Sequence, residues 1–230
     1  MEKNKIKVDC YKTSISSFSP LYLEINDDIK LDIVVKENIS SKLILIGNSD
    51  YSIDIKLENG SNLLVNSLNK NNHVNVNVTL LENSTITYNH SVSAKSDSVN
   101  NFNINHLNNS SISILNNNGI NMDNNKLFFN INGIVPKNLH NITCNQSSKI
   151  INFKDGNSKI IPNLIIDSND IIANHSAYIG EIGEEELFYM KSRGINEIDI
   201  KKLIYKGVLL GKMDLGEEKE EFNKIINEWW

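Results

Sequence analysis

His73-Val-Asn-Val-Asn-Val-Thr-Leu80 alternates apolar and polar residues along its whole length. Successive side chains of a β-strand point to opposite faces, so this alternation predicts a strand with one buried and one solvated face. Similar short segments recur on both sides of it, from about residue 31 to residue 173, between clusters of Gly and Asn. No helical periodicity is visible before Gly180. The body of the chain is therefore predicted to be mostly β.

Two all-β architectures fit these segments: a sandwich or barrel, and a stacked parallel solenoid. The five histidines lie 17, 16, 34 and 35 residues apart, close to multiples of 17. A solenoid with coils of that length would stack them, although coincidence would give the same spacing. The pattern favours the solenoid. The predicted strands cover residues 31–35, 42–46, 51–57, 73–80, 101–106, 111–115, 126–131 and 160–166, and the histidines are His73, His90, His106, His140 and His175.

Bulk composition excludes several classes of protein. With 230 residues, 40% of them apolar, the chain can bury one domain core and carry a small appendage. Its net charge of -5 and the lack of a basic stripe argue against a nucleic-acid partner. The longest apolar runs, such as Leu43-Ile-Leu-Ile46, are too short to span a membrane, and the polar start shows no secretory signal. We expect a cytoplasmic protein.

Asparagine is unusually frequent, at 39 residues. It tolerates the left-handed backbone conformation and hydrogen-bonds its own backbone in turns, so it suits a chain that turns often. Cysteine is rare: Cys10 and Cys144 are too few and too far apart for a disulfide framework or a CxxC metal site.

The pattern becomes helical after Gly180. Acidic residues open a segment at 184–191, and Lys191, Arg193 and Gly194 close it with a C-cap signal. A second helix is predicted over 197–210 and a third over 217–230. We expect a β core over residues 1–180 and a helical domain over 181–230, which packs on the end of the body, presents a partner surface, or does both. The predicted apolar stripes are Ile198, Leu203, Ile204 and Val208, and then Phe222, Ile225, Ile226 and Trp229.

The junction between the two parts resembles a known family. Asp170-Ile-Ile-Ala-Asn-His-Ser-Ala177 followed by Leu187-Phe-Tyr-Met-Lys-Ser-Arg-Gly-Ile195 is similar to the C-terminal signature of the SufB/SufD proteins, D-V-x-x-x-H-[GE]-A and then L-F-Y-x-x-S-R-G-I. The similarity covers roughly residues 100 to 212. The further matching positions are His106 with Ser111, Gly133 after Phe129, Gln146, and Pro162-Asn-Leu-Ile-Ile166.

The resemblance implies a right-handed parallel β-helix with a C-terminal helical domain. SufB and SufD pair with each other or with themselves, and their helices dock the ABC-type ATPase SufC in a complex that assembles iron–sulfur clusters. The chain has no Gly-rich phosphate loop, so we expect it to bind no nucleotide itself. The residues that the resemblance assigns to the ATPase contact are Leu187, Phe188, Tyr189, Arg193 and Gly194.

The resemblance is weaker at the cluster site. SufB has a Cys directly after the strand Gln and a Glu after the His, where this chain has Ser147 and Ser176. A thiolate is the natural soft ligand for iron, and a hydroxyl is a poor substitute. His175 and Cys144 remain as candidate ligands of a transient iron–sulfur cluster, and His without Glu is the SufD pattern. Cys144 is expected on the strand face opposite Ser147.

These observations predict a SufD-like, non-catalytic scaffold subunit with no catalytic residue, working with a SufC-type ATPase and a SufB-like partner or a second copy. One alternative is a minimal SufB-like homodimer that assembles the cluster itself through Cys144 and His175. A remote alternative is a carbohydrate-binding or polysaccharide-cleaving β-solenoid, but Arg193 is the only arginine and such proteins usually carry a secretion signal.

Overall fold

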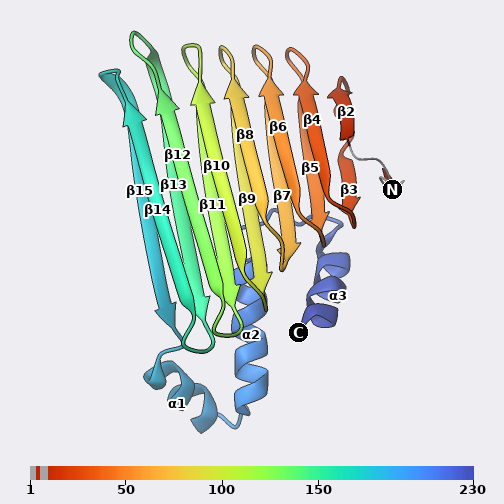
Figure 1. Cartoon of the computed structure of the whole chain (residues 1–230), viewed down its shortest axis with the longest axis vertical. Coiled ribbons are helices and arrows are strands. Elements are labelled where there is room, and N and C mark those ends of the chain that lie inside the picture. The colour runs from red at the N-terminus through yellow and green to blue at the C-terminus, as the bar shows by residue number, and fades with distance from the viewer. Residues whose placement is uncertain (1–3, 6–9) are drawn as a thin grey trace.

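The computed structural model describes residues 4–5 and 10–230 (Figure 1). Two parallel β-sheets face each other, and the chain passes from one to the other with each successive strand. In the described residues sheet A has eight strands: β1 (Asn4–Lys5), β3 (Leu21–Ile25), β5 (Ser40–Gly47), β7 (Asn62–Lys70), β9 (Thr85–Ala94), β11 (Ile112–Asn121), β13 (His140–Asn152) and β15 (Asp170–Glu181). Sheet B has seven there: β2 (Cys10–Ile15), β4 (Ile29–Val35), β6 (Tyr51–Leu57), β8 (Val74–Leu80), β10 (Ser98–His106), β12 (Lys126–Val135) and β14 (Asn157–Ile166).

Each coil contributes one strand to each sheet, and equivalent residues stack in rows. Ile53, Val76, Phe102 and Ile131 form one such row, at steps of 23, 26 and 29 residues along the chain. All four side chains are buried between the sheets. Burying one apolar side chain of this size stabilises the fold by about 1.5–3 kcal/mol. The prediction of a mostly β, parallel solenoid is therefore confirmed, and the sandwich alternative is wrong.

The interpretation of the histidine spacing is wrong. The register places His90 between Ser67 and Asn117, and it places His175 beside Gln146. No histidine stacks on another in the described strands, because one coil takes two strands and two turns of variable length rather than 17 residues. The spacing is a coincidence.

Asparagine ladders line the outer face of sheet B. Asn77 donates a hydrogen bond to Asp54 over 2.8 Å, and Asn103 donates to Asn77 over 2.9 Å. Asn132 and Asn163 continue the same row at 2.8 and 2.9 Å. Stacking identical amides lets each one donate to its neighbour and accept from the next. The ladders give the asparagines a structural use that the composition did not reveal.

Asparagine also occupies the corners of the coils, as the sequence predicted. Asn38, Asn83 and Asn138 have φ values of 58°, 54° and 64°, in the left-handed region. The left-handed conformation costs Asn less free energy than it costs most other residues with a side chain, because the Asn amide can hydrogen-bond locally. Tight corners keep the strands of successive coils in register.

Three helices follow the solenoid: α1 (Glu184–Ser192), α2 (Glu197–Leu210) and α3 (Lys219–Trp229). Their positions agree with the predicted segments. Helices α2 and α3 cover the outer face of sheet A, where Tyr205, Phe222 and Trp229 pack on Ile44 and Leu68. The expectation that the helices pack on the end of the body is therefore wrong, because the apolar surface that needs cover lies on the flank of sheet A.

Polar contacts fix the helices on this flank. Tyr205 donates from its hydroxyl to Ser93 Oγ over 2.7 Å, and Ser91 Oγ donates to the carbonyl of Leu209 over 2.7 Å. Lys42 of β5 pairs with Glu218 over 2.9 Å, and the Glu218 side chain is 7% exposed. Sheet A is therefore buried on both faces beneath the helices. This explains why Leu43-Ile-Leu-Ile46 is an unbroken apolar run rather than an alternating one.

The hydrogen bonds of His106 define its tautomer. Ser111 Oγ donates to the carbonyl of Asn108, so it accepts from His106 Nδ1 over 2.7 Å. His106 Nε2, 2.9 Å from Ser113 Oγ, is then the acceptor of a neutral imidazole. Burial lowers the pKa of His106 to about 4 and that of His90 to about 3. Both rings stay neutral inside the solenoid.

We predict that the protein loses stability in mild acid. Histidine in the unfolded chain titrates near pH 6.5, so the unfolded state binds more protons than the folded state between that pH and about 4. The stabilisation is complete above pH 6.5 and decreases as the pH falls toward the folded values. Each such histidine contributes up to about 1.4 kcal/mol per pH unit. Urea unfolding between pH 7.5 and 4.5 measures this slope.

The variant His106→Gln should reduce the slope of unfolding free energy against pH by the share of one histidine. His140→Gln, at an exposed position, is the matched control. An unchanged acid slope in His106→Gln would contradict the assignment.

Candidate functional site

The predicted cluster residues lie on the last two strands of sheet A, Cys144 on β13 and His175 on β15. Strand β15 is the final strand of sheet A and pairs only with β13, while β14 ends sheet B. No further coil of the described chain stacks on them. The backbone groups of an edge strand and the inward side chains of the last coil are thus open to another molecule.

Cys144 of β13 points into the solenoid. Its side chain is 1% exposed and packs with Val135, Ile142 and Ala173. A Cβ added at Gly133 would lie 2.6 Å from Cys144 Sγ, so glycine makes room for the sulfur. Burial raises the pKa of the Cys144 thiol, and a hydrogen bond with Ser113 opposes this only in part. Cys144 is a protonated, enclosed thiol at neutral pH.

His175 lies on the same inward face of the neighbouring strand. The register pairs Cys144 with Ala173 and Gln146 with His175, so the thiol and the imidazole are diagonal neighbours. His175 is exposed because β15 has no following coil, whereas Gln146 is 4% exposed. Gln146 Nε2 donates to the carbonyl of Asn163 over 3.2 Å, and Gln146 Oε1 has no partner in the described structure. Sequence reasoning named this glutamine only as a point of resemblance.

Ser147 and Ser176 are also brought together, but on the opposite face. Ser176 Oγ donates to Ser147 Oγ over 3.2 Å. The expectation that Cys144 and Ser147 lie on opposite strand faces is correct. The hydroxyls that stand at the family's Cys and Glu positions therefore face away from Cys144 and His175.

A complete metal-ligand set is absent from the described residues. No group of three or more His, Cys, Asp or Glu side chains there could hold a metal ion. His140 and Asp170 lie 3.7 Å apart at an exposed corner, away from Cys144. The side chain of Cys10 lies outside the described part of the chain. One exposed imidazole and one enclosed thiol can supply only part of the coordination of a cluster.

The predicted ATPase-contact residues lie on α1 and its C-terminus. Phe188 and Tyr189 are 76% and 59% exposed, while Leu187 is half-buried. Arg193 donates from Nη2 to Tyr189 Oη over 3.2 Å, and its guanidinium lies 5.1 Å from the centre of that ring. Gly194 has φ of 84°, which ends the helix in the left-handed conformation that glycine favours.

Two residues of α2 extend this apolar surface. Ile198 and Leu203, which the sequence pattern placed in the apolar stripe of α2, are 67% and 56% exposed. The buried residues of α2 are instead Ile200, Tyr205 and Leu209. The pattern could not distinguish them, because α2 has apolar residues on more than one side. We call the exposed residues Phe188, Tyr189, Ile198 and Leu203 the α1–α2 surface.

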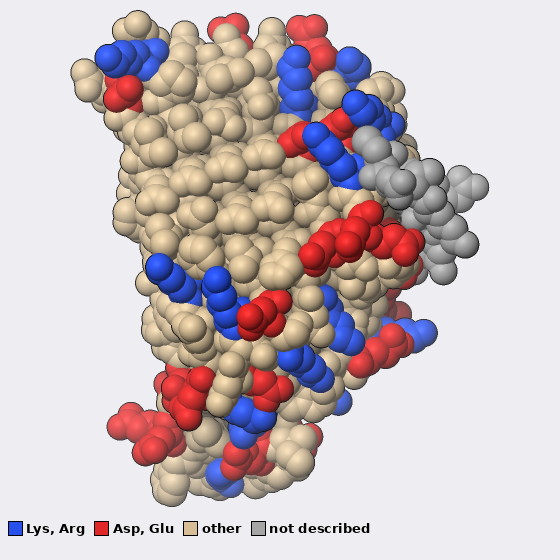
Figure 2. Space-filling model, viewed as in Figure 1, with Lys and Arg blue, Asp and Glu red and all other residues tan. Residues whose placement is uncertain are grey.

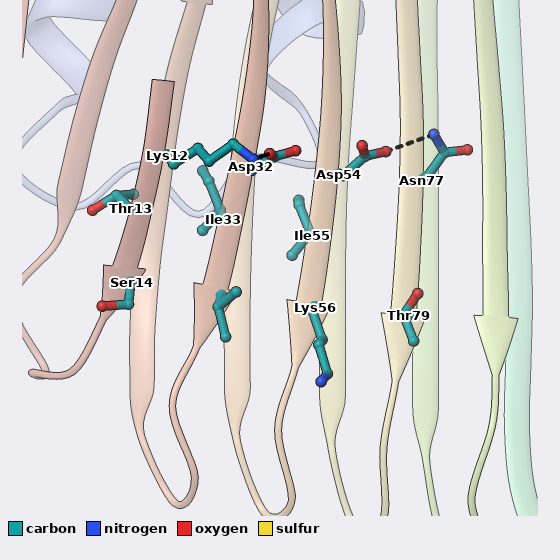
Figure 3. Close-up of a pocket in the computed structure, with 11 residues that line it drawn as sticks. Lys12, Thr13, Ser14, Asp32, Ile33, Asp54, Ile55, Lys56, Asn77 and Thr79 are labelled. Carbon is teal, nitrogen blue, oxygen red and sulfur yellow. Dashed lines mark hydrogen bonds and ion pairs between the residues drawn. The ribbon is translucent and has the colours of Figure 1, made fainter. Parts of the chain in front are cut away.

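A separate groove crosses the outer face of sheet B (Figure 3). Lys12 pairs with Asp32 over 2.9 Å, and Asp54 accepts from Asn77. The hydrogen bond from Asn77 lowers the pKa of Asp54, with Lys30 adding to the effect. The groove contains no histidine or cysteine among its lining residues. Asp32 and Asp54 are paired with Lys12 and Lys30, and the groove lies on the opposite sheet from Cys144 and His175, so it does not form part of the predicted site.

The surface charge can be compared with the expectation that the chain lacks a basic stripe. The face drawn in Figure 2 is largely uncharged over its middle, and its Lys, Asp and Glu side chains lie toward the N-terminal strands, at the upper left corner and across the lower part near the helices. No continuous basic stripe crosses that face. Among the described residues, no helix has the length and apolar character needed to cross a lipid bilayer.

Comparison with known proteins connects this geometry to one family. Residues 26–208 match the model of the SufBD core domain of the SUF system for FeS cluster assembly. Over 70 residues the chain is 33% identical to an iron–sulfur cluster assembly SufBD family protein of Mycobacterium tuberculosis H37Rv, a match that covers 29% of the chain and 18% of the relative. Over 43 residues it is 42% identical to the iron–sulfur cluster assembly protein SufD of Escherichia coli K12, covering 19% of the chain and 10% of SufD.

A protein of Mycobacterium leprae with the same family description is 40% identical over 48 residues, which are 20% of the chain and 12% of that relative. The chain thus matches less than a fifth of the length of these curated relatives. The family model, in contrast, covers most of the chain and includes β13, β15, α1 and nearly all of α2. The chain therefore belongs to the SufBD family of iron–sulfur cluster assembly proteins.

Proposed function

We propose that this chain is a SufD-like, non-catalytic scaffold subunit of an iron–sulfur cluster assembly complex. It holds the nascent cluster, as cargo, at a subunit interface and docks a SufC-type ABC ATPase through its C-terminal helices. The observation that supports this most directly is the position of His175, exposed on the edge strand that ends the solenoid. A ligand in that position is available to a cluster shared with a second subunit.

The exposed edge of β15 favours association with a partner. The strand has 12 residues, and its charged residues are confined to its two ends, Asp170 and Glu181. Ile172 and Ile179 are 61% and 42% exposed. A long, apolar, uncharged edge strand normally pairs with another strand, since its N–H and C=O groups are otherwise left to water. A SufB-like partner or a second copy would cover this edge.

Such pairing would also complete the ligand set. His175 lies near the middle of β15, so an antiparallel partner strand centred there would bring its own side chains beside the imidazole. Ligands from the partner would supply the thiolates that the described part of this chain does not expose. A transient iron–sulfur cluster bound across the interface is consistent with one imidazole from this side.

The SufD-like assignment depends on the state of Cys144. A thiol must lose its proton to bind iron, and burial works against that loss at Cys144. The alternative, a SufB-like homodimer that assembles the cluster with Cys144 and His175, would require the last coil to open. The side chains of Cys144 and His175 do lie on the same inward face, so the alternative has a geometric basis.

The α1–α2 surface supports docking of an ATPase. Its four apolar side chains are exposed on the consecutive helices α1 and α2, while other residues of α2 pack on sheet A. Clusters of exposed aromatic and aliphatic residues commonly mark protein interfaces. The sequence has no Gly-rich phosphate loop, so the nucleotide would be bound and hydrolysed by the partner, in the cytoplasm.

We predict that His175 is required for cluster retention. The chain is co-expressed with a SufC-type ATPase and a SufB-like protein from the same genome, and the complex is reconstituted anaerobically with iron and sulfide. His175→Ala should lose most of the visible iron–sulfur charge-transfer absorbance, because an exposed interface ligand is removed. His140→Ala is the matched control, at another exposed histidine.

Cys144→Ser should leave the absorbance of the reconstituted complex nearly unchanged. Equal losses in His175→Ala and Cys144→Ser would instead support the SufB-like alternative. Full retention of absorbance in both variants would refute a ligand role for this coil.

We predict that the α1–α2 surface carries the ATPase contact. Truncating a well-packed aromatic residue at an interface typically costs about 2 kcal/mol, which weakens binding more than tenfold. Phe188→Ala combined with Leu203→Ala should therefore abolish co-purification of the ATPase without changing thermal unfolding, since both side chains are exposed.

The control is Phe18→Ala, a side chain that is 70% exposed and lies between β2 and β3. Undiminished ATPase binding by the double variant would show that docking occurs elsewhere.

A further inference from the structure

A groove of about 390 Å³ lies between helix α2 and the outer face of sheet A. Gly207 and Gly211 form part of its helical wall, one turn apart on the same side of α2. Asn118 of β11 and Lys149 of β13 come from the sheet, and Lys212 follows the end of the helix. The groove is separate from the contacts of Tyr205 and Leu209 that hold α2 on β9.

Gly207 has no structural reason within the described chain to be glycine. It lies inside α2, where glycine is unfavourable compared with alanine. A Cβ added there would meet no atom within 4 Å, and its φ is not in the left-handed region. The missing side chain leaves the backbone of α2 open to close approach from outside.

Asn118 supplies unused hydrogen-bonding groups at the floor of this groove. It is 8% exposed and lies in register between Ser91 and Lys149 on the outer face of sheet A. Ser91 uses its hydroxyl to bind the carbonyl of Leu209, but the amide of Asn118 has no hydrogen-bond partner within the described residues. The amide oxygen and nitrogen of Asn118 are not sealed from solvent, so they remain available to a ligand in the groove. Its paired donor and acceptor match those of a peptide backbone.

The rim of the groove is positively charged. Lys149 and Lys212 are exposed, and neither has an ion-pair partner in the described part of the chain. Lys149 Nζ lies 5.5 Å from the centre of the Tyr178 ring, which holds the lysine beside the groove. Two unpaired ammonium groups favour a ligand that carries carboxylates.

We propose that this groove binds an extended, acidic peptide segment of another protein. The peptide backbone passes along Gly207 and Gly211 and hydrogen-bonds to Asn118, and its carboxylates pair with Lys149 and Lys212. This inference goes beyond the proposed function, because it needs neither a cluster nor the ATPase. It is therefore tested on the chain alone, and its failure would leave the scaffold proposal unaffected.

The test is selection from a phage-displayed library of random heptapeptides on the immobilised full chain and, in parallel, on the Gly207→Leu variant. Leucine fills the groove wall from an open position, so the variant should fold normally, as circular dichroism and thermal unfolding check. We expect the wild-type chain alone to enrich peptides rich in Asp and Glu. Synthetic copies of these peptides should bind at least about tenfold more weakly to Gly207→Leu and Lys149→Glu, and more weakly as salt increases.

Lys56→Glu is the matched charge-reversal control, since Lys56 is exposed on the outer face of sheet B. Its affinity should equal that of the wild-type chain. The proposal is overturned if the wild-type chain enriches no acidic peptides beyond those on Gly207→Leu. It is also overturned if Lys149→Glu and Lys56→Glu bind the selected peptides equally well.

Discussion

In-register stacking of the coils is the constraint on which the rest of this structure depends. A parallel strand extends a sheet only if each of its residues meets an equivalent position of the preceding coil. Ile53, Val76 and Phe102 satisfy this with buried apolar side chains. On the solvent side, Asn77 and Asn103 satisfy it with amides that bond one another. The composition of the chain, rich in aliphatic residues and asparagine, follows from these two kinds of row.

Stacking must also stop, and the strands at which it stops differ in exposure from those before them. The last coil exposes β15 as an apolar edge and leaves His175 on an inward face that no following coil covers. One coil earlier, the same inward face encloses Cys144, and burial keeps its thiol protonated. Cys144 and His175 are diagonal neighbours, yet the first is enclosed and the second is exposed, because a following strand covers Cys144 and none covers His175.

Helices α2 and α3 cover the apolar outer face of sheet A. Ile44 and Leu68 point away from the interior and would be exposed without Tyr205, Phe222 and Trp229. Helices α1 and α2 also leave Phe188, Tyr189, Ile198 and Leu203 exposed to solvent. Different residues of the same helical segment therefore cover sheet A and remain exposed to solvent.

Residue patterns by themselves determined the strands and the helical tail, because these depend on side chains close in sequence. They did not distinguish a solenoid from a sandwich, and it was the family resemblance that implied the β-helix. The Leu187-Phe-Tyr motif likewise indicated the family, and His175 and Cys144 could be named from their neighbours. Only the tertiary structure decided which residues stack, since turn length sets the register. The strand register places the histidines at different positions of their coils and encloses Cys144 beside Ala173. The packing of α2 leaves Ile198 and Leu203 in solvent. Whether a side chain is buried depends on the residues that the neighbouring coil places against it, and no local sequence pattern specifies those residues.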